Sequence, residues 1–104
     1  MTGIIILCRY NSSRLPGKIL KEINGKTILS YIYERLSMIS LNLEITIATS
    51  CLKSDDIIED YCIKKKYKYY RGNLSNVSKR FLDCAVKNNY ENLVRINGDN
   101  LFLD

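Results

Sequence analysis

The feature that most constrains the fold is an unbroken apolar run near the start of the chain, Ile4-Ile5-Ile6-Leu7-Cys8, which leads directly into a basic loop. Such a run is typical of a strand buried on both faces, as in the parallel sheets of α/β proteins. The loop that follows, Arg9–Lys18, carries three cations, two serine hydroxyls and a glycine. Loops of this kind commonly hold phosphates. The sequence therefore predicts a phosphate-binding loop, with a solvated basic loop as the alternative.

Strands and helices alternate along the rest of the chain. The predicted strands cover about residues 3–8, 43–49, 68–70 and 92–96, and the predicted helices begin at Thr27, at Ser54 or Asp55, and at Ser75. We expect the inward positions of the first two helices to be Ile28, Ile32, Leu36 and Ile39, and then Ile57, Ile58, Tyr61 and Cys62. Asn24-Gly25 predicts a tight turn. The fold class is therefore α/β: one domain over residues 1–104, with a mostly parallel sheet of about four strands and three helices covering both of its faces.

Three features fall at the carboxyl ends of the predicted strands, where parallel sheets bind ligands. They are the loop from Arg9, the turn after Thr49, and Gly98-Asp99. A carboxylate facing bound phosphates would be repelled unless a divalent cation lay between them, so Asp99 predicts a Mg²⁺ site to which Asp104 could contribute. The alternative is that Asp99 only caps a turn.

Several chemistries are excluded by the residues present. A P-loop ending at Gly25-Lys26-Thr27 would need a glycine where Leu20 stands, and the dinucleotide fingerprint GxGxxG is absent. The chain has no histidine, so Cys–His and Ser–His catalysis are ruled out. The four cysteines form no CxxC pair and are expected to be buried, reduced thiols. With no apolar run of about 18 residues and no basic start to the chain, we expect a cytoplasmic protein without a membrane span.

The formal net charge of +5 suits an anionic ligand of any size. Cations and aromatic residues alternate over Lys64–Arg71, a mixture that binds single-stranded nucleic acid in other proteins. The same pattern also fits a helix C-terminus followed by a half-buried strand, which is the interpretation we favour. Arg80 either reaches the ligand edge or is solvated.

The loop Arg9–Lys18 resembles the nucleotide-binding motif of the cytidylyltransferases that activate acidic sugars, the CMP-KDO and CMP-acylneuraminate synthetases. The resemblance is closer to the branch that acts in spore coat polysaccharide biosynthesis, and it covers essentially the whole chain. The further signatures follow in order: Ala48-Thr49-Ser50, Ser54-Asp55-Asp56, Arg71-Gly72 with Val77, Arg80 and Phe81, and Arg95–Asp104.

The resemblance implies a three-layer, Rossmann-like nucleotidyltransferase (GT-A-like) fold. It also implies attack of a sugar oxygen on the α-phosphate of CTP, with pyrophosphate as the leaving group. The residues that it assigns, together with Arg80 and Asp104 from the sequence itself, fall into three overlapping sets. The catalytic set is Arg14, Lys18 and Asp99, the nucleotide-binding set is Cys8, Arg9, Tyr10, Ser13, Arg14, Lys18 and Arg80, and the metal set is Asp99 and Asp104.

The sequence departs from the family in two places. Leu101 stands where a proline is usual, and family members run well past Asp104 into a part that supplies the sugar pocket, a second metal carboxylate and the dimer interface. We therefore expect a truncated version of the fold that forms a homo-oligomer or pairs with a missing C-terminal half. Two other functions stay open: a non-catalytic nucleotide-binding remnant, and an RNA-binding domain that uses Lys64–Arg71.

Overall fold

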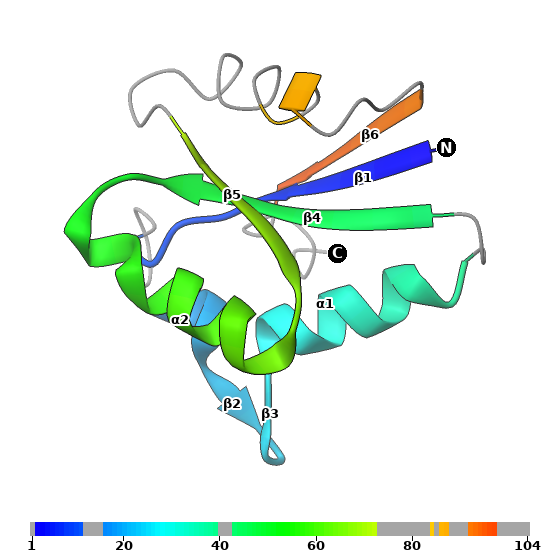
Figure 1. Cartoon of the computed structure of the whole chain (residues 1–104). Coiled ribbons are helices and arrows are strands. Elements are labelled where there is room, and N and C mark those ends of the chain that lie inside the picture. Colours follow the sequence, from blue (N-terminus) through cyan, green and yellow to red (C-terminus); the bar gives the residue numbers. More distant parts are fainter. Residues whose placement is uncertain are drawn as a thin grey trace.

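The centre of the molecule is a parallel four-stranded sheet with the strand order β5-β4-β1-β6 (Figure 1). The computed structural model describes residues 2–11, 16–39, 43–72, 84, 86–87 and 92–97. Within these ranges the strands of the sheet are β1 (Thr2–Leu7), β4 (Leu43–Ser50), β5 (Lys68–Gly72) and β6 (Asn92–Asn97). All four predicted strands are present, and the sheet is parallel throughout, as predicted.

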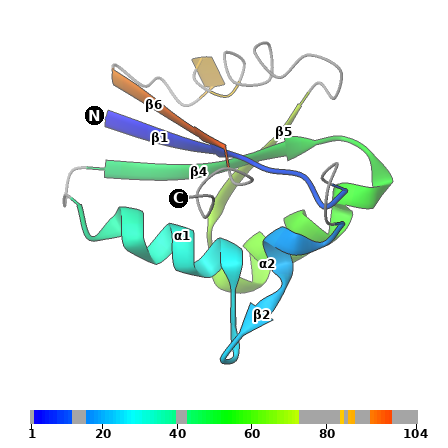
Figure 2. The same ribbon diagram turned by 180° about the vertical axis from the view of Figure 1, so that it is seen from behind.

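Two α-helices, α1 (Ile28–Ser37) and α2 (Asp56–Lys65), lie on the same face of this sheet, as the two opposite views show (Figures 1 and 2). Two 3-10 turns, η1 (Lys18–Leu20) and η2 (Lys53–Asp55), precede the helices. Residues 84, 86 and 87 are helical and fall within the third predicted helix, whose other residues, including Ser75, lie outside the described ranges.

The alternation of side chains along β1 separates two cores. Ile4, Ile6 and Cys8 pack with the residues of α1 and α2, whereas Ile5 and Leu7 pack on the other face with Ala48 and Cys84. Each fully buried isoleucine contributes about 1.5–3 kcal/mol. Because both faces of β1 are covered, the run Ile4–Cys8 is apolar at every position and does not alternate with polar residues.

The register of the sheet aligns the ends of its strands. Leu7 pairs with Ala48 of β4 and with Asn97 of β6, and Ser50 pairs with Gly72 of β5. The segments that follow β1, β4 and β6 therefore leave the sheet at one edge, as predicted. Gly98 and Asp99 follow β6 in the chain and lie outside the described residues.

For α1 and α2, the predicted inward positions are confirmed at the centre of each helix and are wrong at Ile39 and Ile57. Thr27 caps α1 by accepting the Ser30 amide at 3.0 Å. Ile39 is 67% exposed because α1 ends at Ser37, before that position can face the sheet. In α2 the buried stripe is narrower than predicted. Ile58 and Cys62 are buried, but Ile57 is 46% exposed.

The predicted Asn24-Gly25 turn is confirmed, and it joins a short hairpin that the sequence did not predict. Its strands are β2 (Glu22–Ile23) and β3 (Lys26–Thr27), which pair antiparallel. Asn24 and Gly25 have φ values of 55° and 82°, the left-handed backbone that two-residue hairpin turns require. The hairpin projects below the helices in Figure 1.

All four cysteines are free thiols, as predicted, but one of them is exposed. Cys8, Cys62 and Cys84 are buried, whereas Cys51 lies exposed in the turn after β4. No helix in the described part of the chain is both long and apolar enough to cross a membrane.

Candidate nucleotide-binding site

The basic loop begins where β1 ends and is closed at its base by a backbone hydrogen bond. The Cys8 amide still donates to the Ala48 carbonyl at 3.0 Å, so β1 is held to β4 up to the first residue of the loop. The Gly17 amide then donates to the Tyr10 carbonyl at 2.6 Å. The chain thus leaves the sheet after Cys8, and Gly17 closes the loop back onto Tyr10.

Gly17 is required at this closure for two reasons. Its φ is 78°, a backbone conformation that L side chains rarely adopt. In addition, a Cβ atom at this position would lie 2.9 Å from the Tyr10 hydroxyl. Lys18, directly after it, begins η1.

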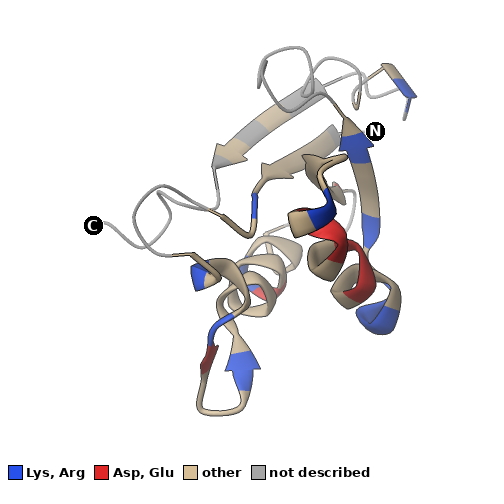
Figure 3. Cartoon of the chain, turned by 90° about the vertical axis from the view of Figure 1, so that its left-hand side faces the viewer, with Lys and Arg blue, Asp and Glu red and all other residues tan. Residues whose placement is uncertain are grey.

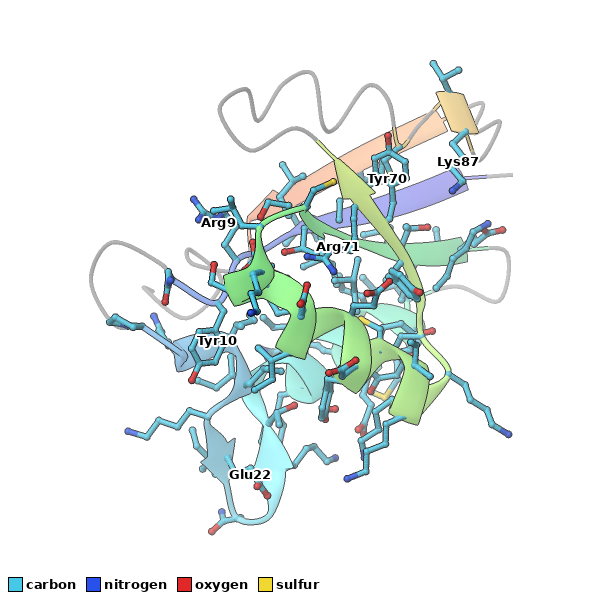
Figure 4. The ribbon with its side chains drawn as sticks, turned by 60° about the vertical axis from the view of Figure 1, so that its left-hand side comes forward. Arg9, Tyr10, Glu22, Tyr70, Arg71 and Lys87 are labelled. Carbon is cyan, nitrogen blue, oxygen red and sulfur yellow. The ribbon has the colours of Figure 1, made fainter. Side chains whose placement is uncertain are left out.

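A buried carboxylate anchors the start of the loop. Asp55, at the end of η2, has no exposed surface. Its Oδ1 accepts the Tyr10 amide at 2.7 Å, and its Oδ2 lies 3.4 Å from Arg9 Nε. Oδ2 also accepts the hydroxyl of Ser50, the last residue of β4. Figure 4 shows Arg9 and Tyr10 coming from the segment that follows β1.

A pocket of about 460 Å³ lies beside the closed loop. Its walls combine two lysines with apolar and aromatic surface from the loop, η1 and α2: Tyr10, Pro16, Gly17, Lys18, Leu20, Lys21 and Ile57. Ile57, which was predicted to face inward, instead supplies part of this wall. The pocket therefore offers positive charge next to a partly apolar surface.

Of the predicted site residues, Cys8, Arg9, Tyr10 and Lys18 are described. Arg9 and Tyr10 both contact Asp55, and Tyr10 and Lys18 line the same pocket. Cys8 is buried in the core that β1 forms with the helices. The predictions for Ser13, Arg14, Arg80, Asp99 and Asp104 fall on residues outside the described ranges.

Asp55 and Ser50 are site residues that the sequence did not assign. The second helix was expected to begin at Ser54 or Asp55. Asp55 does stand at the N-cap position of α2, but its side chain makes no capping hydrogen bond. Two signals were available: both residues belong to signatures of the resembling family, and both lie near the turn after Thr49, at the edge where the predicted loop also lies.

Arg71, near the end of β5, holds the turn that carries Asp55. Its Nε donates to the Ser50 carbonyl at 2.8 Å and its Nη2 to the Leu52 carbonyl at 2.7 Å. Its Nη1 forms ion pairs with Asp56 at 2.8 Å and Glu59 at 3.0 Å on α2. Figure 3 shows acidic positions on α2 with basic positions near them.

The segment Lys64–Arg71 also has internal roles, as the favoured interpretation predicts. The Tyr67 ring stacks on Tyr33, with 3.8 Å between ring centroids and an interplanar angle of 13°. Tyr70 packs against the core on the opposite face of the sheet. Tyr67 and Tyr70 thus make contacts within the protein, as expected for a helix C-terminus followed by a half-buried strand.

No metal cluster is found among the described residues, where no group of three or more His, Cys, Asp or Glu side chains could hold an ion. Mg²⁺ needs only one or two carboxylates when phosphate oxygens and water complete its coordination. Asp99, on which the Mg²⁺ prediction rests, lies outside the described residues.

Comparison with known proteins connects this geometry to one family. The family model described as cytidylyltransferase matches residues 3–104. The spore coat polysaccharide biosynthesis protein SpsF of Bacillus subtilis is 33% identical in an alignment that covers 96% of this chain and 43% of that protein. The 3-deoxy-manno-octulosonate cytidylyltransferase of Christiangramia forsetii is 30% identical, over 96% of this chain and 40% of its own length.

Solved structures agree with these sequence matches. A cytidylyltransferase from Leptospira borgpetersenii superposes with a TM-score of 0.86 at 34% identity, over 94% of this chain and 41% of that one. The CMP:2-keto-3-deoxy-manno-octonic acid synthetase solved in complex with CTP gives a TM-score of 0.73 at 28% identity, over 93% and 39%. The chain thus spans about two fifths of the relatives that it matches.

Proposed function

Because the chain belongs to the cytidylyltransferase family, we propose that it binds CTP with Mg²⁺ at the carboxyl edge of its sheet, for transfer of CMP to an acidic sugar in surface polysaccharide biosynthesis. The observation that carries the proposal is the loop after β1, closed between Tyr10 and Gly17 and anchored by Asp55 beside a basic pocket. These contacts hold the described ends of the loop, at Tyr10 and Gly17, which lowers the cost of ordering those ends when a ligand binds.

In this proposal the cations of the loop bind the triphosphate. Arg9 and Arg14 supply planar guanidinium groups that can hold two phosphate oxygens at once, and Lys18 supplies a point charge. Ser13 adds a neutral donor, and the backbone of residues 8–10 lies next to the cytosine base.

Arg80 is proposed as a further nucleotide contact. Asp99 would hold Mg²⁺ and Asp104 would assist it. The metal, when bound, supplies neutralisation of the triphosphate charge.

The proposed reaction is an in-line displacement at phosphorus. A sugar oxygen forms a bond to the α-phosphorus of CTP, the bond from that phosphorus to the oxygen bridging to the β-phosphate breaks, and pyrophosphate leaves. Negative charge develops on the leaving pyrophosphate, where Arg14 and Lys18 would stabilise it. In this proposal the sugar pocket is formed by residues other than these 104, since the chain spans about two fifths of the length of these relatives.

Calorimetric titration with CTP in Mg²⁺ tests the proposal. Lys18→Ala, Arg14→Ala and Asp99→Ala should each weaken binding at least about tenfold, because each removes a contact between opposite charges. Lys26→Ala is the matched control, because Lys26 lies on the hairpin and pairs with Glu34 of α1. This variant should bind CTP like the unmodified chain. Absence of measurable CTP binding by the unmodified chain in Mg²⁺ would refute the proposal.

A second measurement separates catalysis from binding alone. Pyrophosphate release should require CTP, Mg²⁺ and an acidic sugar, and should increase when the C-terminal part of a relative is added. CTP binding without pyrophosphate release across a panel of acidic sugars, in the presence of that part, would identify a non-catalytic nucleotide-binding module.

A further inference from the structure

Asp55 is buried in a way that its position in the chain does not require. A carboxylate is costly to bury unless charged or hydrogen-bonding partners compensate for the lost water. Asp55 has no exposed surface, and its side chain does not cap α2, the helix that it precedes. Its partners instead come from the two segments that leave the sheet beside it, after β1 and at the end of β4.

The three groups that face the Asp55 carboxylate are all donors. The Tyr10 amide donates to Oδ1, and the Ser50 hydroxyl and Arg9 Nε both face Oδ2. An ionised carboxylate accepts at both oxygens and therefore satisfies all three. An asparagine has one oxygen, so that its NH₂ group would have to face either the amide or the guanidinium, donor against donor.

The contact with Asp55 also sets the direction of the Arg9 guanidinium. Only Nε faces the carboxylate, and Nη1 and Nη2 have no partner among the described residues. The Arg9 side chain is 31% exposed. The edge of the guanidinium that can hold two phosphate oxygens is thus left available on the solvent side.

The turn that carries Asp55 is itself fixed from behind. Arg71 donates to the carbonyls of Ser50 and Leu52, on either side of the exposed Cys51. Asp55 therefore acts from a held position, and the orientation that it gives to Arg9 is set before any ligand arrives.

We propose that Asp55 is a positioning residue, which holds Arg9 through Nε so that its two Nη groups face the phosphates of the nucleotide. The inference rests on the proposed CTP site and adds a residue to it. Asp55 does not touch the nucleotide, and its effect on binding passes through Arg9.

A double-mutant cycle on CTP affinity tests this inference. The variants are Asp55→Asn, Arg9→Ala and the double variant, with Asp60→Asn as a matched control on the exposed side of α2. Asp55→Asn should weaken CTP binding about tenfold when Arg9 is present and change it less than about twofold in the Arg9→Ala background. An equal loss in both backgrounds would show that Asp55 only stabilises the loop, and would overturn the inference while leaving the proposed function intact.

Nuclear magnetic resonance of the unmodified chain gives a second readout if Asp55→Asn fails to fold. The Arg9 Nε–H signal should exchange slowly with water, because it faces a buried carboxylate, and should stay protected when CTP is added while the Nη signals shift. Fast exchange of Nε–H, or loss of its protection on CTP binding, would overturn the inference. Failure of the unmodified chain to bind CTP at all would overturn the proposed function and this inference together, and that outcome is seen in the first titration.

Discussion

Replacing Arg71 by methionine should destabilise the protein more than any other single change of a charged side chain on β5. Methionine keeps much of the length of the side chain but removes every donor. Arg71 is 16% exposed and uses all three of its nitrogens: Nε and Nη2 on two carbonyls of the turn after β4, and Nη1 on two carboxylates of α2. It therefore ties the end of β5 to the turn and to the helix at once.

The size of the effect follows from the exposure of each partner. Asp56 is 53% exposed and Glu59 29%, so the two ion pairs contribute about 0–1 kcal/mol each. Hydrogen bonds from a charged donor contribute about 1.5–3 kcal/mol, and we count fully only the bond to Ser50, because the bond to Leu52 is at the surface. The total loss is about 3 kcal/mol, a large share of the roughly 5–15 kcal/mol by which domains are stable.

Urea unfolding followed by circular dichroism measures this loss. Lys68→Met is the control, since Lys68 lies on the same strand, pairs with Glu44 and is 45% exposed, and it should cost no more than about 1 kcal/mol. An Arg71→Met variant that loses no more free energy of unfolding than Lys68→Met would refute the argument that the guanidinium fixes the turn.

Two further predictions concern a buried thiol and a buried hydroxyl network. Burial raises the pKa of the Cys62 thiol to about 12. At pH 8 only the exposed Cys51 should therefore react quickly with a disulfide reagent, and Cys51→Ser should abolish that fast phase. A second fast-reacting thiol would contradict the assigned burial. Because this folded pKa exceeds the unfolded value of about 8.5, the free energy of unfolding should fall as the pH rises from about 9 towards 12, and this pH-dependent part should be smaller in Cys62→Ala. Tyr61→Phe removes the hydroxyl that bonds Thr27 Oγ1 at 2.8 Å and Ser30 Oγ at 2.5 Å, and should cost about 1–2 kcal/mol in urea unfolding; unchanged stability would show that water replaces the hydroxyl.

The strands could be predicted from the sequence because burial on both faces leaves a local signal. The run Ile4–Cys8 is apolar at every position, and the structure shows one face of it against the helices and the other against Ala48 and Cys84. The helix starting at Thr27 carried a similarly local signal in its cap and in its apolar spacing. The errors at Ile39 and Ile57 occur where such a pattern passes the end of the buried surface.

The role of Asp55 could not be predicted because it depends on contacts between residues far apart in the sequence. Its partners Arg9 and Tyr10 lie 46 and 45 residues earlier. Aspartate is a common N-cap residue, so helix capping alone accounts for an aspartate directly before a helix. Only the parallel pairing of β1 with β4 brings the two segments together.

The positive charge of the chain is a poor guide to its ligand until the ion pairs are known. Arg71 is committed to two carboxylates and two carbonyls, so it belongs to the scaffold. Arg9 is committed through Nε alone, and Lys18 forms no ion pair with any described residue. At the carboxyl edge, Arg71 is therefore unavailable to an anion. Arg9 is available in a fixed orientation, and Lys18 is freely available. A nucleotide that binds here should therefore depend strongly on Arg9 and Lys18, and on Arg71 only as far as the fold does.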